Sequence, residues 1–311
     1  MNAPLSKTHR SGFVGIIGRP NVGKSTLLNY YLGEKVAIVS RHPQTTRRRI
    51  LGVLTREDAQ VLFLDAPGLY EPHHTLDRHM LEAAKSVLDE ADVLLVMIDG
   101  RARLTEADRR VFARVKQALR GGSRAAKRSG LLAINKVDLA NKPRLLPLLE
   151  ECANTALFAD CIPVSALTGE QMGVLLKRII RLLPEGPTWY EPEQRTDQTA
   201  TQRISELVRE QVLQATRQEV PHAVGVLVEQ VEDRERVTAI QATILVERSG
   251  QKAILIGKGG AMLKQIGQEA RRDIERLLGR KVYLGLWVKV VPGWRNDERV
   301  LRELGFGGAG Q

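Results

Sequence analysis

The chain of 311 residues is poor in cysteine and in aromatic side chains. Its only two cysteines, Cys152 and Cys161, exclude a disulfide framework and fit a compartment in which thiols stay reduced. Phe, Trp and Tyr make up only 4% of the residues, so we expect no platform of aromatic side chains on which bases stack.

Long apolar runs and the His and Cys spacings of metal sites are also missing. No apolar run approaches the ~18 residues that a membrane-spanning helix needs. Residues 1–11 lack an apolar core, so we interpret them as a flexible lead rather than a signal peptide. We therefore expect no membrane-spanning segment and no metal site built from closely spaced His and Cys.

Positive charge is in excess. Lys and Arg number 47 against 36 Asp and Glu, which leaves a formal net charge of +11 at pH 7. A charge of this size indicates an anionic partner, either nucleic acid or an acidic membrane surface. The charge alone does not choose between the two.

Residues 18–25 have the Gly-x-x-x-x-Gly-Lys-Ser pattern of a phosphate-binding loop. The apolar run 13–17 precedes them, so a strand, a glycine turn and a helix N-terminus would aim backbone N–H groups at one spot. In this pattern Lys24 reaches the β- and γ-phosphates, and the Ser25 hydroxyl binds Mg²⁺. The predicted GTP-binding residues of the loop are Gly18, Arg19, Pro20, Asn21, Val22, Gly23, Lys24, Ser25 and Thr26.

A second part of the predicted site begins at Asp65, which ends the apolar run 61–64. A carboxylate at a strand tip beside the phosphate loop can hold Mg²⁺, and the Gly68 N–H can respond to the γ-phosphate. The residues expected here are Asp65, Ala66, Pro67, Gly68 and Leu69.

A third part indicates that the base is guanine. Asn135-Lys136-Val137-Asp138 follows the apolar run 131–134. The Asp138 carboxylate can accept from both N1–H and the 2-amino group of guanine, and adenine has neither donor. We expect Asn135 to tie this segment to the phosphate loop and Lys136 to cover the base. Ser165, Ala166 and Leu167 complete the set, with the Ala166 N–H directed at guanine O6.

In their order, these segments resemble the Era subgroup of the translation-factor-related GTPases over residues 12–183. The resemblance identifies the switch I motif and implies Lys24 and Thr46 as catalytic residues. It implies Ser25, Thr46 and Asp65 as ligands of Mg²⁺, with Thr45 as an open alternative to Thr46. It also associates a K⁺ ion with Asn21. The switch I residues are Gln44, Thr45, Thr46, Arg47 and Arg48.

Leu69 stands where Ras-type enzymes carry the glutamine that orients the attacking water. An aliphatic side chain cannot orient water, so the backbone, an ion, another residue or a partner must do so. We therefore expect slow intrinsic hydrolysis, on the order of 10⁻⁴ to 10⁻³ s⁻¹ or somewhat above.

Apolar runs alternate with helical patterns through the first half of the chain, as at 92–98 before 105–119. This alternation predicts an α/β domain at 12–183 with a mostly parallel, doubly wound sheet. Three prolines between residues 184 and 192 predict a stiff linker, which we place at 184–198. We expect Trp189 and Tyr190 to pack on one of the domains.

Residues 199–291 predict an α+β domain in the order α-β-β-α-α-β, with a glycine loop between consecutive helices. This arrangement resembles a type II KH domain, whose Gly-x-x-Gly turn clamps about four nucleotides of single-stranded backbone. We expect bases in an aliphatic groove built from Ile254, Ile256 and the second strand of this domain. At 292–311 we expect a short closing helix over 294–304 and a frayed tail from 305 onward. The predicted RNA-binding residues are Ile254, Ile256, Gly257, Lys258, Gly259, Gly260, Lys264 and Arg271.

Together, the resemblance implies a GTPase that binds 16S ribosomal RNA near its 3′ end and acts in 30S subunit assembly and rRNA maturation. It further implies a monomeric, cytoplasmic protein with GTP and GDP as ligands. Two alternatives stay open: a GTPase in cell-cycle or growth control that binds peripherally to the anionic inner face of the cell membrane, and a GTPase that acts on tRNA. The RNA element and the need for exchange or activating factors also stay open.

Overall fold

The structure, a computed structural model, describes residues 9–68, 72–121 and 128–307. Contacts between Cα atoms divide the chain into two compact units. Unit 1 comprises Met1–Ala37, Thr46–Tyr70 and Leu81–Asp197, and unit 2 comprises Ile38–Thr45, Glu71–Met80 and Gln198–Gln311. Two short segments from the first half of the sequence therefore belong to unit 2.

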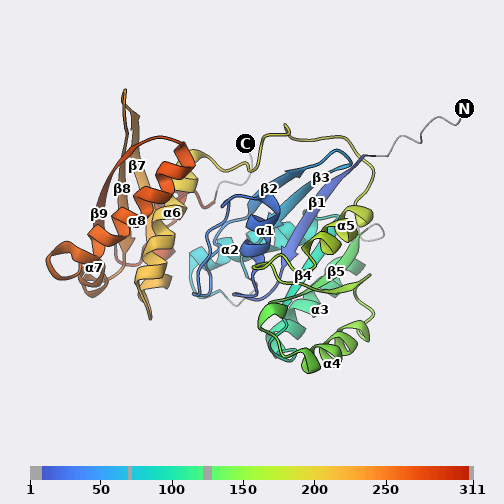
Figure 1. Cartoon of the computed structure of the whole chain (residues 1–311). Helices are drawn as coiled ribbons and strands as arrows, with labels where there is room; N and C mark the ends of the chain where they lie inside the picture. Colours follow the sequence, from blue (N-terminus) through green and yellow to red (C-terminus); the bar gives the residue numbers. More distant parts are fainter. Residues whose placement is uncertain (1–8, 69–71, 122–127, 308–311) are drawn as a thin grey trace, which may run out of the picture. The chain divides into compact units, whose positions relative to one another are not determined.

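Unit 1 contains a six-stranded sheet in the order β2-β3-β1-β4-β5-β6 (Figure 1). Only β2 runs antiparallel to its neighbour, β3, and the other pairs are parallel. The strands are β1 (Arg10–Ile17), β2 (Ile50–Thr55), β3 (Ala59–Asp65), β4 (Val93–Asp99), β5 (Ser129–Asn135) and β6 (Cys161–Pro163). Because the parallel strands point the same way, the segments that follow β1, β3, β4 and β5 meet at one edge of the sheet.

Apolar side chains of the central strands alternate between two cores. In β3, Val61 and Phe63 join one core while Leu62 and Leu64 join the other. Helices α1 and α5 complete the first core, and α2, α3 and α4 complete the second. The five helices are α1 (Lys24–Leu32), α2 (Thr75–Glu90), α3 (Glu106–Arg120), α4 (Lys142–Ala153) and α5 (Met172–Leu182). Helices on both faces of a mostly parallel sheet confirm the predicted α/β architecture.

The N-terminal lead is shorter than predicted. Arg10 and Ser11 already belong to β1 and pair with Ala59 and Gln60 of β3, while residues 1–8 lie outside the described part of the chain. The interpretation of 1–11 as flexible is therefore wrong for residues 10 and 11. Arg10 and Ser11 are polar, so the apolar run that follows them did not predict that they belong to the strand. They pair with β3 through backbone hydrogen bonds, which do not depend on the side chains.

The linker packs on unit 1, as expected. The backbone N–H groups of Trp189 and Tyr190 both donate to Gln60 Oε1, at 2.7 and 3.0 Å. The Trp189 indole N–H donates to Ser11 Oγ at 3.0 Å, although the residue stays 61% exposed. Gln60 itself is fully buried, so its amide holds the linker against the edge of the core.

Unit 2 follows the predicted order α-β-β-α-α-β. Its sheet has the order β7-β8-β9, with β7 antiparallel and β9 parallel to β8. Helix α6 packs on β7 and α8 packs on β9, so the helices lie on one face of the three strands (Figure 1). The elements are α6 (Ala200–Ala215), β7 (Gly225–Asp233), β8 (Thr238–Val246), α7 (Ser249–Ile256), α8 (Ala261–Leu278) and β9 (Val282–Val290).

Two residues of α6 hold the segment 38–45 within unit 2. The Val39 N–H donates to Glu210 Oε1 at 3.0 Å. The Arg209 guanidinium donates to the Thr45 carbonyl, and Arg209 is only 2% exposed. The chain then returns to unit 1 at the next residue.

The C-terminal residues close one end of the second sheet. Trp294 is fully buried in the 3₁₀ helix η5 (Trp294–Asn296), and its indole N–H donates to the Ala223 carbonyl at 2.9 Å. Helix α9 (Glu298–Glu303) follows, and the Phe306 N–H donates to the Leu301 carbonyl at 2.7 Å. Phe306 is buried, so the expectation that residues from 305 onward are frayed is wrong for it. Among the described helices, none is long and apolar enough to cross a membrane.

Candidate functional site

The phosphate-loop pattern forms the turn between β1 and α1. Gly23 has a φ of 104°, and a Cβ there would lie 2.3 Å from Asn135 Nδ2. A Cβ at Gly18 would lie 2.6 Å from the Met97 carbonyl oxygen. Both positions therefore require glycine, and the backbone N–H groups at the start of α1 can approach a phosphate closely.

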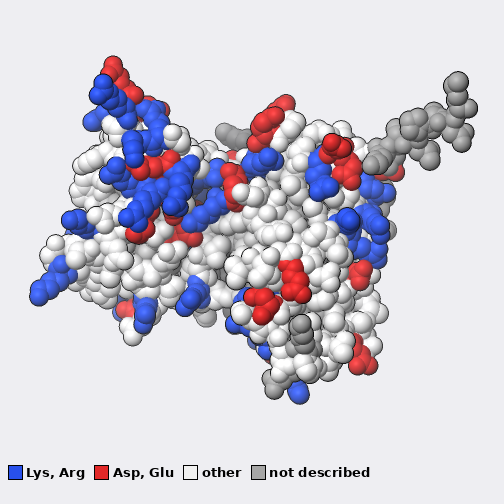
Figure 2. Space-filling view, in the orientation of Figure 1, with Lys and Arg blue, Asp and Glu red and all other residues white. Residues whose placement is uncertain are grey.

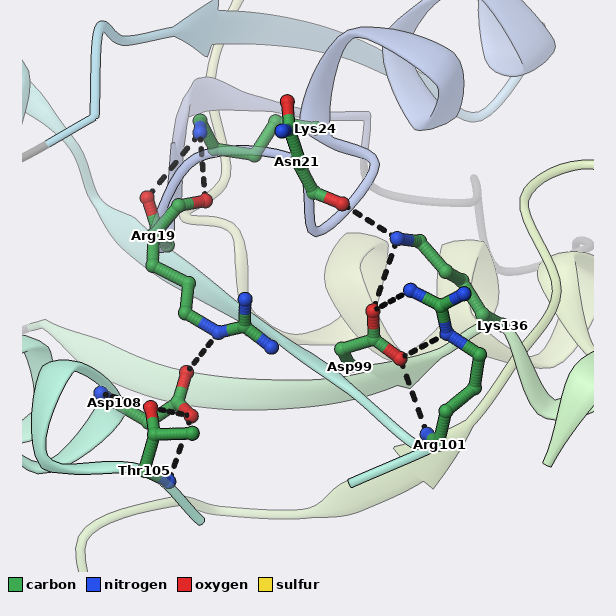
Figure 3. A network of polar contacts seen from close by, with 9 residues as sticks. Arg19, Asn21, Lys24, Asp99, Arg101, Thr105, Asp108 and Lys136 are labelled. Carbon is green, nitrogen blue, oxygen red and sulfur yellow. Dashed lines mark hydrogen bonds and ion pairs between the residues drawn. The ribbon is translucent and has the colours of Figure 1, made fainter. Parts of the chain in front are cut away.

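Lys24 is buried at the start of α1. Its Nζ donates to the carbonyls of Gly18 and Arg19, at 3.2 and 3.3 Å (Figure 3). Burial lowers the pKa of Lys24 because it removes water from the ammonium group, and the nearby Asp65 carboxylate partly opposes this. An anion beside the loop would supply the counter-charge that the two carbonyls provide only in part.

Three oxygen atoms from separate segments converge beside the loop. Ser25 Oγ donates to Asp65 Oδ2 at 2.7 Å, and it lies 3.0 Å from Thr46 Oγ1. Thr46 Oγ1 also lies 3.4 Å from Asp65 Oδ2. These are the three predicted metal ligands, and they form a set of hard oxygen donors. The described residues contain no group of three or more His, Cys, Asp and Glu side chains that could hold a metal ion.

The second carboxylate oxygen of Asp65 tests whether this set of oxygen atoms fits a metal ion. Asp65 is fully buried, and Oδ1 has no hydrogen-bond partner among the described residues. Burial raises the pKa of Asp65, while Lys24 and the two hydroxyls oppose the rise. A divalent cation would pair with this buried carboxylate and satisfy the orphan oxygen, so the residues present fit Mg²⁺.

The two threonines of switch I lie in different surroundings. The Thr45 hydroxyl donates to the His42 carbonyl at 2.7 Å and so closes a local turn. The Thr46 hydroxyl instead meets Ser25 and Asp65. Among the other switch I residues, Gln44 has a left-handed φ of 62° and Arg47 is buried, with Arg48 beside it. The geometry therefore favours Thr46 over Thr45 as the metal ligand.

The segment after β3 passes close to the phosphate loop. A Cβ at Gly68 would lie 3.0 Å from the Pro20 ring, which brings the backbone of Asp65–Gly68 against the loop. Ala66 is buried and Pro67 follows it. Leu69 lies outside the described residues.

Asn135 joins the phosphate loop to both segments of the predicted base site. Its Nδ2 donates to the Val22 carbonyl at 2.8 Å, which confirms the expected tie to the loop. Its Oδ1 accepts the Ala166 N–H at 2.9 Å. That N–H was predicted to face guanine O6, and here it is directed at Asn135. A role toward guanine thus stays a prediction.

Sequence reasoning missed a carboxylate that fixes Lys136. The Lys136 Nζ donates to the Asn21 carbonyl at 2.5 Å and to Asp99 Oδ2 at 3.0 Å (Figure 3). Arg101 also binds Asp99, with bonds of 2.9 and 2.7 Å from Nε and Nη2. Burial would raise the pKa of Asp99, but the bonds from Arg101 and Lys136 outweigh it and lower the pKa below its ordinary value. The sequence feature that could have indicated this contact is the position of Asp99, a carboxylate at the end of a parallel strand.

A second missed contact anchors the phosphate loop on α3. Arg19 Nε donates to Asp108 Oδ1 at 3.1 Å (Figure 3). Asp108 also caps α3, because its carboxylate accepts the Thr105 N–H at 3.0 Å and its own N–H donates to Thr105 Oγ1. The loop is therefore held from the start of α3 as well as from β5.

The remaining base-site residues occupy the loops after β5 and β6. Asp138 lies in the short 3₁₀ helix η2 (Val137–Leu139), and its side chain is exposed. Ser165 is fully buried, and its Oγ accepts the Thr168 N–H at 3.1 Å. Leu167 is 75% exposed. Thr26 lies in α1, next to Ser25.

In unit 2, the predicted RNA loop connects α7 to α8. Gly257, Gly259 and Gly260 all have positive φ, at 69°, 58° and 81°. A Cβ at Gly257 would lie 2.8 Å from Met262 Cβ, whereas a Cβ at Gly259 or Gly260 would meet nothing within 4 Å. The backbone at 259 and 260 is therefore open to a ligand that approaches closely.

Basic side chains gather over the region of α8, with acidic side chains among them (Figure 2). Arg271 binds Glu275 at 3.2 Å, so part of its charge is already compensated. Lys258 and Lys264 are exposed beside the glycine loop. Ile254 is 48% exposed, while Ile256 packs against the core. The helix-facing side chains of β8 are fully buried, so the predicted aliphatic groove keeps only Ile254 as an exposed member.

Comparison with known proteins fits both units. The family model described as "50S ribosome-binding GTPase" matches residues 13–136, and a KH-domain model matches residues 219–295. An Era variant from Aquifex aeolicus, solved with GDP·AlF4⁻, is 39% identical to the chain. The match covers 96% of this chain and 99% of that one, with a TM-score of 0.89.

The chain belongs to the Era family of GTPases. A second solved Era protein, in complex with MgGDPNP and nucleotides 1506–1542 of 16S ribosomal RNA, is also 39% identical. It covers 96% of this chain and 99% of its own, with a TM-score of 0.90. The match to Era proteins thus takes in the nucleotide-site segments of unit 1 and the KH domain of unit 2 together.

Proposed function

We propose that the chain is a GTP-hydrolysing switch that binds 16S ribosomal RNA near its 3′ end and acts in 30S subunit assembly and rRNA maturation. One observation carries the proposal: a guanine-nucleotide site and a Gly-x-x-Gly loop occur in one chain that matches, over 96% of its length, an Era protein bound to MgGDPNP and 16S rRNA nucleotides. The family model's description refers to the 50S subunit, so the RNA target is the point that most needs a direct test.

The nucleotide chemistry is assigned to residues around the phosphate loop. Lys24 would bind the β- and γ-phosphates, and the loop N–H groups would stabilise charge on the transferred phosphoryl group. Ser25, Thr46 and Asp65 would hold Mg²⁺, which when bound neutralises charge on the phosphate oxygens. The unpartnered Asp65 Oδ1 and the 3.0 Å approach of Ser25 and Thr46 support this assignment.

The base specificity is assigned to Asp138. Its exposed carboxylate can accept two hydrogen bonds from the edge of guanine, while Lys136 is held at the loop by Asn21 and Asp99. The proposal also includes a K⁺ ion near Asn21. It further includes slow intrinsic hydrolysis, because Leu69 stands where Ras-type enzymes carry the water-orienting glutamine. Hydrolysis rates in K⁺ and in Na⁺ test the first, and single-turnover hydrolysis without RNA tests the second.

RNA binding is assigned to the Gly-x-x-Gly loop with Lys258, Lys264 and Arg271. The open backbone at Gly259 and Gly260 supports a close approach of sugar-phosphates. We place the protein in the cytoplasm as a monomer. Peripheral binding to an anionic membrane stays a second candidate because of the +11 net charge.

The deciding experiment is crosslinking in cells followed by sequencing of the bound RNA. The proposal expects reads concentrated near the 3′ end of 16S rRNA and lost in a Gly260→Asp variant. Reads concentrated on 23S rRNA or on tRNA would overturn the 30S assignment. Flotation with acidic liposomes, with and without RNA, tests the membrane candidate separately.

A further inference from the structure

The sheet of unit 2 has a face that α6, α7 and α8 do not cover. In β9, Leu284, Leu286 and Val288 contact the core beneath the helices. The alternate positions point to the opposite face, where Tyr283 is 60% and Trp287 is 52% exposed. Two aromatic side chains thus share the open face of one strand in a chain with few aromatic residues.

Gly285 lies between these two aromatic residues and shapes the surface. A Cβ at position 285 would lie 2.8 Å from Trp287 Cη2 and 2.3 Å from Gln241 Oε1. Gly285 pairs with Gln241 across β8 and β9. The missing side chain lets the indole lie along its own strand with the Gln241 amide beside it. A glycine inside a strand often marks such a close approach.

Trp287 forms one wall of a hollow with a volume of about 610 Å³ on this face. Its other walls come from polar side chains of β7 and β8: Glu229, Gln230, Gln241 and Thr243. Gln241 Oε1 is buried and has no hydrogen-bond partner among the described residues. A buried acceptor without a donor is unfavourable, so the hollow is short of an N–H group.

We propose that this face is a second surface for single-stranded RNA, on which an unpaired base with an exocyclic amino group stacks on Trp287. An indole face stacks on any base, because every base presents a π-face. The acceptors Gln241 Oε1 and the Glu229 carboxylate then favour adenine, cytosine and guanine, which carry amino groups. Uracil is disfavoured because its single N3–H lies between two carbonyl oxygens, which these acceptors would repel. The inference rests on the proposed function in one respect, namely that the chain binds single-stranded RNA.

Charge at both ends of the strand fits a phosphate backbone. Lys281 and Lys289 are separated from Tyr283 and Trp287 by even numbers of residues, so they follow the same alternation along the strand. Both lysines are exposed. Lys281 Nζ lies 3.8 Å from Glu275, a separation at which a phosphate can compete for the ammonium group. The aromatic pair therefore lies between two cations along the strand, and surfaces that bind single-stranded nucleic acids commonly combine these two features.

This face is separate from the Gly-x-x-Gly loop. The loop 257–260 connects α7 and α8, which pack on the other side of the sheet. The proposal differs from our expectation that the chain has no stacking platform. That expectation was drawn from total aromatic content, whereas two residues at the right spacing on one strand are enough to form such a surface.

The test measures binding of labelled oligoadenylate, oligocytidylate and oligouridylate of about eight nucleotides by anisotropy at one fixed salt concentration. The proteins are the wild type, Trp287→Ala, Trp287→Phe, Gln241→Leu and Gly260→Asp, with Trp189→Ala as a matched loss of an exposed tryptophan. Trp287→Ala should weaken binding of the first two oligomers by about 5- to 150-fold, and Trp287→Phe by much less. Gln241→Leu should reduce the preference for oligocytidylate over oligouridylate, a readout that a merely structural role would not move.

The two proposals fail in different ways. If Trp287→Ala binds like the wild type while Gly260→Asp loses binding, the open-face surface is refuted and the proposed RNA function stands. If only Trp287→Ala loses binding, the open face is supported and the glycine loop is refuted. Unchanged binding in both variants refutes both. A wild-type dimer in light scattering that Trp287→Ala dissociates, with RNA affinity unchanged, would assign the face to a second copy of the chain and overturn the proposal.

Discussion

The Asn135 side-chain amide donates to the Val22 carbonyl at 2.8 Å, so β5 holds the middle of the phosphate loop in place. The same side chain accepts the Ala166 N–H at 2.9 Å. Asn135→Ala would leave both backbone groups buried without a partner, which costs about 1–3 kcal/mol for each. We expect GTP and GDP affinity to fall by about tenfold or more and the protein to melt earlier. Fluorescent-nucleotide titration and thermal unfolding measure the two effects, and unchanged nucleotide affinity would contradict the role of this link.

Asp138→Asn should shift the base preference from guanine toward xanthine. The amide can donate where xanthine accepts, and it no longer offers two charged acceptors to guanine. The loss for GTP is about 3 kcal/mol, or more than a hundredfold in Kd. Competition titrations with GTP, xanthosine triphosphate and ATP measure the change. A mutant that binds GTP as before and rejects xanthosine triphosphate would show that another residue reads the base.

Ser25→Ala should remove the dependence of GTP affinity on Mg²⁺. In the wild type we expect tighter binding in Mg²⁺ than in EDTA, because the Ser25 hydroxyl belongs to the oxygen set with Thr46 and Asp65. The variant should bind GTP equally weakly in both conditions and lose hydrolysis. Ser86→Ala is a matched control, since that hydroxyl donates to the Ala83 carbonyl in its own helix and has no other hydrogen bond to the described residues. A full Mg²⁺ effect in Ser25→Ala would contradict the assignment.

Gly260→Asp should weaken RNA binding by at least tenfold and leave RNA-free GTP hydrolysis intact. The substitution puts a side chain and a negative charge where nothing lies within 4 Å, so it blocks a ligand without a clash inside the protein. Gly279→Asp is the matched control, because its φ of 65° is similarly left-handed and its surroundings are equally open. The pair separates backbone strain from loss of the binding surface. Equal RNA affinity in the two variants would count against the KH assignment.

Cys152 should resist alkylation in the folded protein. Burial raises the pKa of its thiol from 9.0 to about 12. Burial also raises the pKa of Cys161, but this residue is only partly buried and so easier to reach. Because the raised pKa disfavours the thiolate in the folded state, this contribution to stability is complete below pH 9 and is lost as the pH rises toward 12. Iodoacetamide labelling at pH 8.5, followed by peptide mass spectrometry, should modify Cys161 first. Preferential labelling of Cys152 would refute its burial.

The segments of the nucleotide site could be predicted because each one depends on a few residues that are consecutive in the sequence. A glycine turn between a strand and a helix positions its backbone N–H groups, and an aspartate at a strand end positions its carboxylate, without help from distant parts of the chain. The link from Asp99 to Lys136 could not be predicted in the same way. It requires β4 and β5 to be neighbours in the sheet, and a turn such as Asp99-Gly100-Arg101 looks ordinary in the sequence.

Choices between adjacent residues also depended on the structure. Thr45 and Thr46 are chemically identical, and only the turn at His42 separates their hydroxyls. The open face of the second sheet was missed for a related reason. In the sequence, Gly285 only weakens the pattern of a strand. The structure shows that its missing side chain leaves room for the Trp287 ring.

The chain passes from unit 2 to unit 1 at the peptide bond between Thr45 and Thr46, and this limits how the protein can be divided into fragments. On one side, the Thr45 carbonyl accepts from Arg209 of α6, and on the other, the Thr46 hydroxyl lies at Ser25. A fragment that stops at Asp197 would lack Arg209 and Glu210, the partners of the segment 38–45, and also Asn296, which accepts the Thr75 N–H at 3.0 Å. No single cut in the chain yields two intact halves, so kinetic constants measured on an isolated GTPase fragment would describe an enzyme in which the segments around Thr45 and Thr75 have lost their anchors.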